Sequence, residues 1–245
     1  MHRVNHRLIV PISAAIACVG LAGAIPAVAR PSSSGTSSLW SSSQSGAAHS
    51  AQDRVSDALG LVRQMKENPD LAAVLRRARG VFIIPHYGKG GFIVGGQGGG
   101  GVVLVNNDGE WTSPAFYSLS GGSIGAQAGG EGGAIAMILM TRRAVDRFEN
   151  ASSSWSLNGN AGLTVVNWSG KTQANTSRGD VILWTNASGL YGGLTASLTH
   201  ISPDTKMDRA YYRRAVTSRE ILAGDVSSPR ANALRDALAS RVASR

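Results

Sequence analysis

The sequence feature that most constrains the fold is a glycine-punctuated run from Trp111 to Met140, which reads WTSPAFYSLSGGSIGAQAGGEGGAIAMILM. Each glycine inside a helix costs about 0.5 to 1 kcal/mol relative to alanine, so this run does not suit an ordinary helix. Glycine in a strand marks a bulge, tight curvature or close approach of another backbone or a ligand. The run therefore predicts curved strands. The composition, with 31 glycines and 16% charged residues, also indicates a β-rich body.

Residues 1–29 have the pattern of a secretory signal peptide: a basic start, the apolar stretch Leu8–Gly23 and a small-residue site at Ala27-Val28-Ala29. Cleavage after Ala29 would give an exported protein, periplasmic or envelope-associated, and would remove the only cysteine. The alternative is a bacterial lipoprotein that is lipidated at Cys18. Residues 30–50 are Ser-rich and are predicted to be a disordered linker, so residues 51–245 are expected to form a single domain.

The chain is basic, with a net charge of +9. Residues 1–29 carry two arginines and no acid, so the remainder has 22 basic and 15 acidic residues, a net charge of +7. Outside the cytoplasm this charge points to anionic lipid head groups or acidic envelope polymers rather than to nucleic acid. The plainer alternative is that the charge only keeps the protein soluble.

Two helices are predicted at the start of the domain. Apolar residues recur at helical spacing from Ala51, which predicts an amphipathic helix ending near Asn68. Asn68-Pro69-Asp70 has the pattern of a second helix start. Arg76, Arg77 and Arg79 fall in the last turn of this second helix, where the helix dipole favours cations. They are interpreted either as a solvated helix end or as the rim of an anion site.

Strands follow from Gly80. Val81–Pro85 is predicted to be a buried strand, and the glycines of Gly90–Gly101 are expected to separate two further apolar runs. Asn106-Asn107-Asp108-Gly109 predicts a tight hairpin turn. Thr141–Asn150 predicts a short helix whose inward residues are Ala144, Val145 and Phe148.

The second half continues with short segments. Strands are predicted at Trp155–Val166, Asp180–Thr185 and Leu190–His200, and Pro203–Arg214 reads as a polar segment with two tyrosines. A helical turn at Ser218–Leu222 and a final amphipathic helix after Pro229 complete the chain. The predicted fold class is α+β: a curved, glycine-rich antiparallel sheet or partial barrel packed with N- and C-terminal amphipathic helices.

Motifs for catalysis and cofactor binding are weak in this chain. Gly121–Gly125 matches the G-x-S-x-G elbow around Ser123, and His200 follows it, but the elbow needs a strand that turns into a helix. Gly96–Gly101 matches G-x-G-x-x-G without a helix behind it. The His and Cys residues lack the paired spacing of zinc sites. Glu131 stands among glycines and could point either way. We therefore expect no catalytic residue, no metal and no cofactor, with a Ser123 esterase as the least favoured alternative.

An ordered set of segments between residues 52 and 240 resembles the SYLF family of lipid-binding domains, which is also described as actin-binding in a yeast member. The segments that carry the resemblance are Ala78–Pro85, Gly101–Val105, Trp111–Tyr117, Ser120–Gly129, Glu220–Leu222 and Pro229. The resemblance implies non-enzymatic binding of phospholipid, in this case by an exported bacterial member. Actin is not expected as a partner of an exported bacterial protein.

The function predicted from charge and resemblance together is binding of anionic phospholipid membranes in the bacterial cell envelope, through basic residues and an amphipathic helix. The alternative from another class is a structural module that binds an envelope protein. The candidate lipid-binding residues form two groups, one near the first strand (Arg76, Arg77, Arg79, His86 and Lys89) and one in the polar segment (Lys206, Arg209, Arg213 and Arg214).

Overall fold

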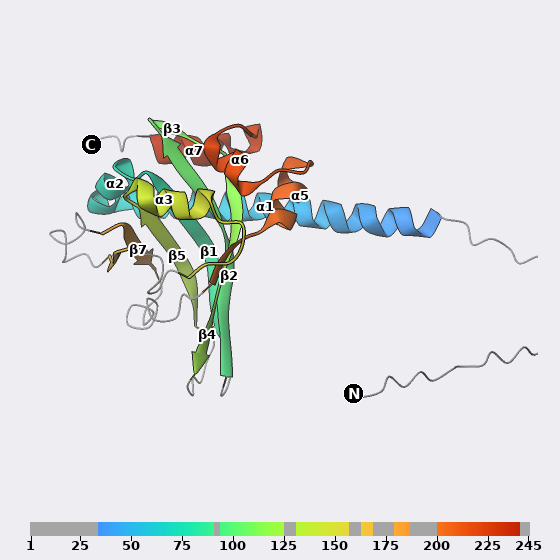
Figure 1. Cartoon of the computed structure of the whole chain (residues 1–245), viewed down its shortest axis with the longest axis horizontal. Helices are drawn as coiled ribbons and strands as arrows, with labels where there is room; N and C mark the ends of the chain where they lie inside the picture. Colours follow the sequence, from blue (N-terminus) through green and yellow to red (C-terminus); the bar gives the residue numbers. More distant parts are fainter. Residues whose placement is uncertain are drawn as a thin grey trace, which may run out of the picture.

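A computed structural model of the chain describes residues 34–90, 94–124, 131–156, 163–168, 179–186 and 200–240 (Figure 1). The predicted signal segment 1–29, Cys18 and all but the last residue of the strand predicted at Leu190–His200 lie outside these residues, and so does the tail after Ser240. The division into signal, linker and domain therefore stays a prediction. In the described part, no helix is both long enough and apolar enough to cross a bilayer.

The described helices and strands are largely segregated along the chain, as in an α+β fold. The helices are α1 (Ser34–Glu67), α2 (Pro69–Arg76), α3 (Arg142–Glu149), α5 (Thr205–Tyr212), α6 (Ser218–Ala223) and α7 (Asn232–Ala239), with a 3-10 turn at Pro229–Ala231. The strands are β1 (Gly80–Gly90), β2 (Val94–Asn107), β3 (Glu110–Trp111), β4 (Ala115–Ile124), β5 (Glu131–Leu139), β6 (Val165–Asn167), β7 (Val181–Thr185) and β8 (His200–Pro203).

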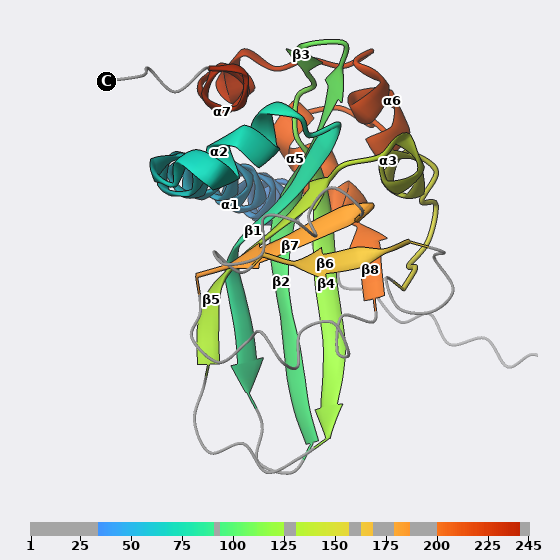
Figure 2. The same ribbon diagram turned by 90° about the vertical axis from the view of Figure 1, so that its left-hand side faces the viewer.

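The strands form one curved sheet in the order β6-β7-β5-β1-β2-β4-β8, with β3 paired to β2 (Figure 2). All pairs between these strands are antiparallel except β6 and β7, which run parallel, so the sheet is mixed and curls into a half-barrel. The predicted α+β class with a partial barrel is confirmed. The parallel pair departs from the predicted all-antiparallel sheet.

Both faces of the sheet are covered by helices and are apolar. Val81, Ile83 and Leu104 belong to the apolar layer under α1, α2, α5 and α7. Phe82 and Val103 belong to the opposite layer, which packs against α3 and α6. Adjacent strand residues point to opposite faces, so the uninterrupted apolar run of β1 fills both layers.

Pro85 marks an irregularity in β1. Proline has no N–H to give to a ladder and is therefore found at bulges and edges. The register of β1 shifts between Ile84 and Tyr87 on β5, and between Ile83 and Gly88 on β2. The shift places Tyr87 in the same apolar layer as Phe82 and Ile84, although its position is odd and theirs are even.

The glycines of β2 do not form the predicted spacer between two strands. Val94–Asn107 is one continuous strand that pairs with β1 on one side and β4 on the other. A Cβ atom at Gly101 would lie 2.3 Å from the Ile83 carbonyl oxygen, and one at Gly99 would lie 2.3 Å from the His86 carbonyl oxygen. The glycines are therefore explained by close backbone approach inside the sheet.

The turn after β2 is confirmed. Asp108 and Gly109 both have positive φ angles, 52° and 105°, as the tight hairpin turn between β2 and β3 requires. The Asn106 side-chain oxygen accepts a hydrogen bond from the Gly109 N–H at 2.7 Å.

Helix α1 begins at Ser34, which is earlier than the composition predicts, and ends at Glu67 as expected. Of the apolar stripe predicted in this helix, Val55, Val62 and Met65 are at most 3% exposed, and Leu59 is partly buried against the same core. In this structure the apolar face of α1 packs on the sheet. It is therefore not free to enter a bilayer, contrary to the predicted role of an amphipathic helix.

The two short helices predicted from capping patterns are confirmed. The Asn68 side chain accepts hydrogen bonds from the N–H groups of Asp70 and Leu71 at the start of α2. Thr141 caps α3, whose inward residues are Ala144, Val145 and Phe148 as predicted.

Candidate functional site: the basic segment of α5

The polar segment after β8 forms helix α5, which the structure fixes at both ends. The Asp204 carboxylate accepts from the Met207 N–H at 3.1 Å and caps the N-terminus. At the other end, the buried Tyr211 ring lies 5.2 Å from the Phe116 ring, and the Tyr212 hydroxyl donates to the Pro114 carbonyl at 2.8 Å. The helix is therefore held against β4 by its two tyrosines.

Asp208 is the only acidic residue between Thr205 and Arg214, and it is fully buried. Its carboxylate accepts hydrogen bonds from the Phe116 N–H at 2.9 Å and from the Ser218 hydroxyl at 3.1 Å. Burial raises the pKa of Asp208 to about 7, because the charged form is poorly solvated there. Asp208 thus lies inside the protein and adds little negative charge to its surface, whereas Asp204, the cap of the helix, is 28% exposed.

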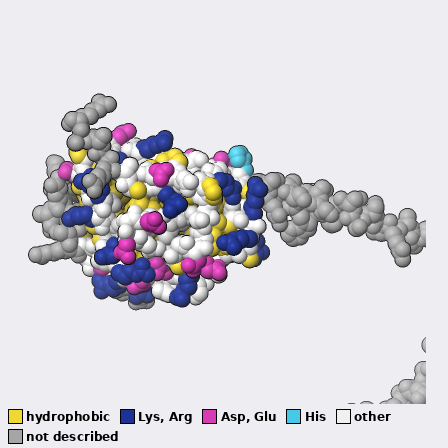
Figure 3. Space-filling view, turned by 90° about the horizontal axis from the view of Figure 1, so that it is seen from above, with side chains coloured by type: hydrophobic (Ala, Val, Ile, Leu, Met, Phe, Trp, Pro, Cys, Tyr) yellow, Lys and Arg dark blue, Asp and Glu magenta, His cyan; other side chains and the backbone are white. Residues whose placement is uncertain are grey.

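Every cation of the same segment points to solvent. Lys206, Arg209, Arg213 and Arg214 are exposed, and among the described residues none of them forms an ion pair within 4 Å. We call these four residues the basic segment. Figure 3 shows Lys and Arg side chains gathered near the end of the body from which α1 projects, whereas basic and acidic side chains are mixed along another edge of this face.

The last two residues of the basic segment line a pocket of about 390 Å³ together with a third arginine, Arg230. We call it the arginine pocket. Residues from α5 and from the turn before α7 meet in it, although they are separated by more than ten positions in the sequence. Its lining is Tyr212, Arg213, Arg214, Ser227, Ser228, Pro229 and Arg230.

Two contacts fix Arg230 at this pocket. Its guanidinium carbon lies 4.5 Å from the centre of the Tyr211 ring, a cation–π contact, and the guanidinium donates a hydrogen bond to the Tyr211 carbonyl. Sequence reasoning missed Arg230, because it lies outside the polar segment and only the folded chain brings it beside Arg213.

The first predicted group is not brought together as a single rim. Arg76, Arg77 and Arg79 are exposed at the junction of α2 and β1. His86 lies seven residues beyond Arg79, roughly 20 Å along the strand, and its Nε2 atom is 3.0 Å from the Asp57 carboxylate on α1.

Lys89 lies in β1 with its Cα opposite that of Glu131, and its side chain is outside the described part. In Figure 1 α2 and α5 lie at opposite ends of the body, although both belong to the helical layer on one face of the sheet, so the two predicted groups are separate from each other.

Two cations of α1 take part in internal contacts. The Arg54 guanidinium lies against β2, where a Cβ at Gly100 would be 2.3 Å from its Cζ, and its Nη1 is 3.9 Å from the Asp204 carboxylate. Burial lowers the pKa of Arg54 despite the nearby Asp204. The Lys66 ammonium donates to the Ala237, Leu238 and Ser240 carbonyls at the end of α7. These two cations therefore hold the helices to the sheet and to one another.

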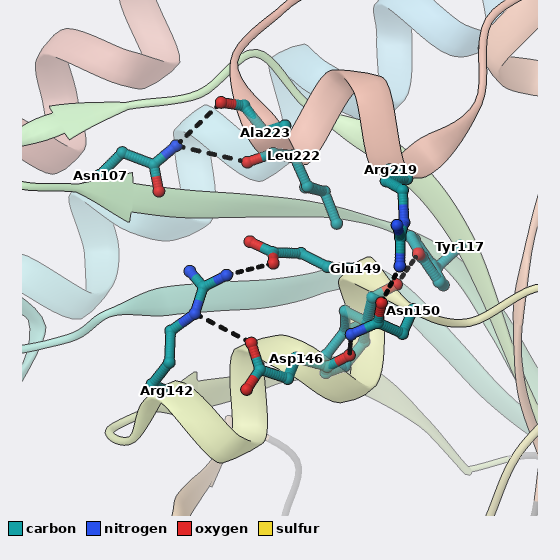
Figure 4. Close-up of polar contacts among 10 residues, drawn as sticks. Asn107, Tyr117, Arg142, Asp146, Glu149, Asn150, Arg219, Leu222 and Ala223 are labelled. Carbon is teal, nitrogen blue, oxygen red and sulfur yellow. Dashed lines mark hydrogen bonds and ion pairs between the residues drawn. The ribbon is translucent and has the colours of Figure 1, made fainter.

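The arginines on the opposite face also serve the scaffold. Figure 4 shows Arg142 bonded to Asp146 and Glu149 within α3, and Arg219 of α6 bonded to Asn150. Asn107 donates to two carbonyls at the end of α6. This face offers fewer unpaired cations than α5 does.

The structure does not support the alternative prediction of an esterase that uses Ser123. Ser123 lies within strand β4, with its Cα opposite that of Gly95, and not at a strand-to-helix turn. Asp180, one acid that could complete a triad, accepts from Thr141, Arg143 and the Thr164 N–H, which ties α3 to the sheet. The Gly96–Gly101 motif lies inside β2, with no helix after it to meet a dinucleotide. The described residues contain no group of three or more metal-ligating side chains.

Comparison with known proteins gives a family. The family model described as Ysc84, a Las17-binding protein actin regulator, matches residues 120–241. Protein YSC84 of Saccharomyces cerevisiae is 30% identical over 162 residues, 64% of this chain and 34% of that protein. LAS seventeen-binding protein 3 of the same yeast is 29% identical, over 64% of this chain and 35% of that protein.

An animal relative gives the same picture. SH3 domain-containing YSC84-like protein 1 of Bos taurus is 28% identical over 162 residues, 64% of this chain and 47% of that protein. The chain thus spans about a third to a half of the length of these relatives. Their names describe binding and regulatory proteins rather than enzymes, which supports a non-enzymatic protein by inference. Residues 120–241 thus match the Ysc84 family model, and the predicted resemblance to the SYLF family is confirmed.

Proposed function

We propose that this protein is a non-enzymatic module that binds anionic phospholipid membranes through the basic segment of α5. The observation that carries the proposal is the separation of charge between residues 205 and 214, where the four cations are exposed and Asp208 is buried. A surface of one sign raises the local concentration of partners of the opposite sign. Anionic head groups are such partners, and a bilayer presents many of them at once.

The proposed contact is electrostatic and does not use the apolar face of α1. That face is buried against the sheet, and exposing it would cost about 25 cal/mol for each Å² of apolar surface. The cations of the basic segment need no such rearrangement. Each Lys or Arg near an anionic surface contributes about 1 kcal/mol, so four together would give a weak, reversible and salt-sensitive association.

Sedimentation with liposomes tests this function. The full chain is mixed with vesicles of phosphatidylglycerol and phosphatidylcholine, or of phosphatidylcholine alone, at low and at high salt. We expect pelleting with the anionic vesicles at low salt and strong loss of pelleting at high salt, because ions screen exposed charges beyond about 10 Å at 0.1 M. Equal pelleting with both kinds of vesicle, or binding that salt leaves unchanged, contradicts the proposal.

A second candidate function is binding of a protein partner, which the comparisons favour. The family description names a Las17-binding actin regulator, and several relatives carry SH3 domains by name. The prediction that actin is not a partner finds no support in these names. Co-sedimentation with actin filaments separates the two candidates: pelleting with filaments and not with anionic liposomes would favour the protein-binding module.

The compartment belongs to the same proposal. We propose that residues 1–29 direct export and that the protein meets its lipid in the cell envelope. The mass of the protein recovered from cells that express the full chain distinguishes the alternatives. Cleavage after Ala29 gives an N-terminus at Arg30, whereas a lipoprotein keeps Cys18 with an added lipid mass.

A further inference from the structure

The arginine pocket is a more specific feature than a basic surface. Three arginines, Arg213, Arg214 and Arg230, line an open pocket of about 390 Å³, and its lining contains no acidic residue. That volume falls in the range typical of small-molecule sites, about 300 to 1,000 Å³. The pocket has room for one small anion and part of the group that carries it.

One acid, Glu220, interacts electrostatically with Arg214 of this pocket, and its carboxylate is already hydrogen-bonded. Its carboxylate accepts from the Thr217 N–H at 2.7 Å and from the Thr217 hydroxyl at 2.8 Å in a capping box. The Thr217 N–H, the Thr217 hydroxyl and, to a smaller extent, Arg214 lower the pKa of Glu220. Glu220 thus weakens the positive field at Arg214 without forming an ion pair within 4 Å in the described part.

Arg230 is held in place before any ligand arrives. The Tyr211 ring and the Tyr211 carbonyl hold its guanidinium at the pocket. A guanidinium carries five N–H donors in a fixed fork, so donors remain after the bond to Tyr211. Fixing a side chain in advance lowers the entropy lost when a ligand binds.

Arg213 occupies a backbone position that suits glycine better. It ends α5 with φ 55° and ψ 26°, in the left-handed region, where glycine is the usual residue at a helix end. Non-glycine residues held in this region cluster at functional sites. A guanidinium at this position joins the pocket, which glycine could not supply.

We propose that the arginine pocket binds a phosphate group presented as a monoester. Planar guanidinium forks match phosphate oxygens bidentately. A phosphomonoester carries about −1.5 to −2 charges at pH 7, more than the single charge of a diester, and three guanidinium groups favour the higher charge. The monoester can belong to a lipid head group or to a soluble molecule. The lipid form of this inference rests on the proposed membrane function.

The experiment separates these sources. Binding of inorganic phosphate and of glycerol 3-phosphate to the full chain is measured by calorimetry, and binding to vesicles is measured with phosphatidic acid or with phosphatidylglycerol at matched surface charge. We expect tighter binding of phosphatidic acid vesicles than of phosphatidylglycerol vesicles. We also expect Arg230→Gln to weaken the binding of phosphatidic acid vesicles and of glycerol 3-phosphate at least tenfold.

Arg213→Gly controls for folding. Glycine relieves the left-handed conformation, so this variant should unfold at an equal or higher urea concentration while its affinity for phosphomonoesters falls at least tenfold. Arg63→Gln removes one exposed charge from α1, outside the pocket, and should change these affinities less than threefold. If Arg230→Gln and Arg213→Gly leave these affinities unchanged, the proposal that the arginine pocket binds a phosphomonoester is wrong.

Failure of the membrane function gives a different result. If glycerol 3-phosphate binds in a way that depends on Arg230, but the protein pellets with no anionic vesicle, the arginine pocket is a site for soluble phosphomonoesters. The lipid form of the inference is then wrong. If both anionic vesicles pellet the protein to the same extent and Arg230→Gln changes nothing, the membrane function is supported and the phosphomonoester site in the arginine pocket is refuted.

Discussion

At the scale of single residues, the glycines of β2 show how close packing selects the sequence. Gly99 and Gly101 face the β1 backbone at distances that leave no room for a side chain, whereas Gly100 faces the Arg54 guanidinium of α1. Each glycine is thus required by a neighbour far away in the sequence. This is why Val94–Asn107 forms a strand in spite of the low strand propensity of glycine.

Gly101→Ala is expected to lower the free energy of unfolding by about 3 kcal/mol. The added methyl group would lie 2.3 Å from the Ile83 carbonyl oxygen, and the backbone of the central sheet would have to move. Urea denaturation followed by circular dichroism measures the change.

The matched control is Gly60→Ala in α1, where a Cβ would meet nothing within 4 Å. Alanine is the better helix former, so this variant is expected to gain about 0.5 to 1 kcal/mol. A Gly101→Ala variant as stable as the natural protein would show that close approach is not the reason for this glycine.

Residue patterns predicted some of these positions and not others. The buried face of α3 and the positive φ angles of Asp108 and Gly109 follow from local patterns that the sequence displays. The continuous β2 does not, because glycine carries no side chain from which a period of two can be read. The same limit explains why Arg230 was missed, since its place in the arginine pocket depends on the path of α6 and the turn after it.

At the scale of elements, α5 depends on one buried carboxylate. Asp208 bonds to the Phe116 N–H of β4 and to the Ser218 hydroxyl of α6, so it joins three elements at one point. Burial raises the pKa of Asp208 from 3.8 to about 7 in the folded protein. Between pH 3.8 and about pH 7, Asp208 therefore keeps its proton in the folded protein and has lost it in the unfolded chain.

The stability of the fold should therefore fall as the pH rises from about 4 to 7. Below pH 4 both states are protonated at Asp208 and its full contribution is present, whereas above pH 7 the contribution is lost. One pKa unit corresponds to about 1.4 kcal/mol, so the effect is roughly 2 to 4 kcal/mol.

Asp208→Asn removes this titration and keeps a side-chain oxygen for the Phe116 N–H. Urea midpoints at pH 4.5 and 7.5 compare the variant with the natural protein, and the variant is expected to gain relative stability at the higher pH. Parallel pH profiles of the two proteins would mean that Asp208 does not titrate in this range.

Elements with strong end signals were predicted correctly. Asn68-Pro69-Asp70 and Thr141 fix the starts of α2 and α3 through local side-chain caps, which need no tertiary contact. The sequence predicts only a polar segment at Pro203–Arg214, because the buried face of α5 consists of Asp208 and Tyr211 rather than an aliphatic stripe. The parallel pair β6–β7 depends on a crossover that no local pattern encodes.

At the scale of the whole molecule, the central claim concerns where the positive charge is free. The composition gives the net charge of +9, but it does not reveal which basic residues form internal contacts and which face solvent. Arg54 and Lys66 hold α1 in place, Arg142 and Arg143 pair with acids, and the basic segment of α5 remains exposed. The sequence predicts the two groups of cations, and the fold places them at opposite ends of one helical layer (Figure 1).

The measurement that tests this claim most directly compares two triple variants of equal charge in liposome sedimentation. One variant replaces Lys206, Arg209 and Arg214 by glutamine, and the other replaces Arg76, Arg77 and Arg79. Loss of about 1 kcal/mol per cation predicts that the first variant binds anionic vesicles about a hundredfold more weakly. The second should lose less than tenfold, because α2 lies at the other end of the body from α5 and salt screens its charges from a bilayer that contacts α5. Equal losses, or a larger loss for the α2 variant, would contradict the account.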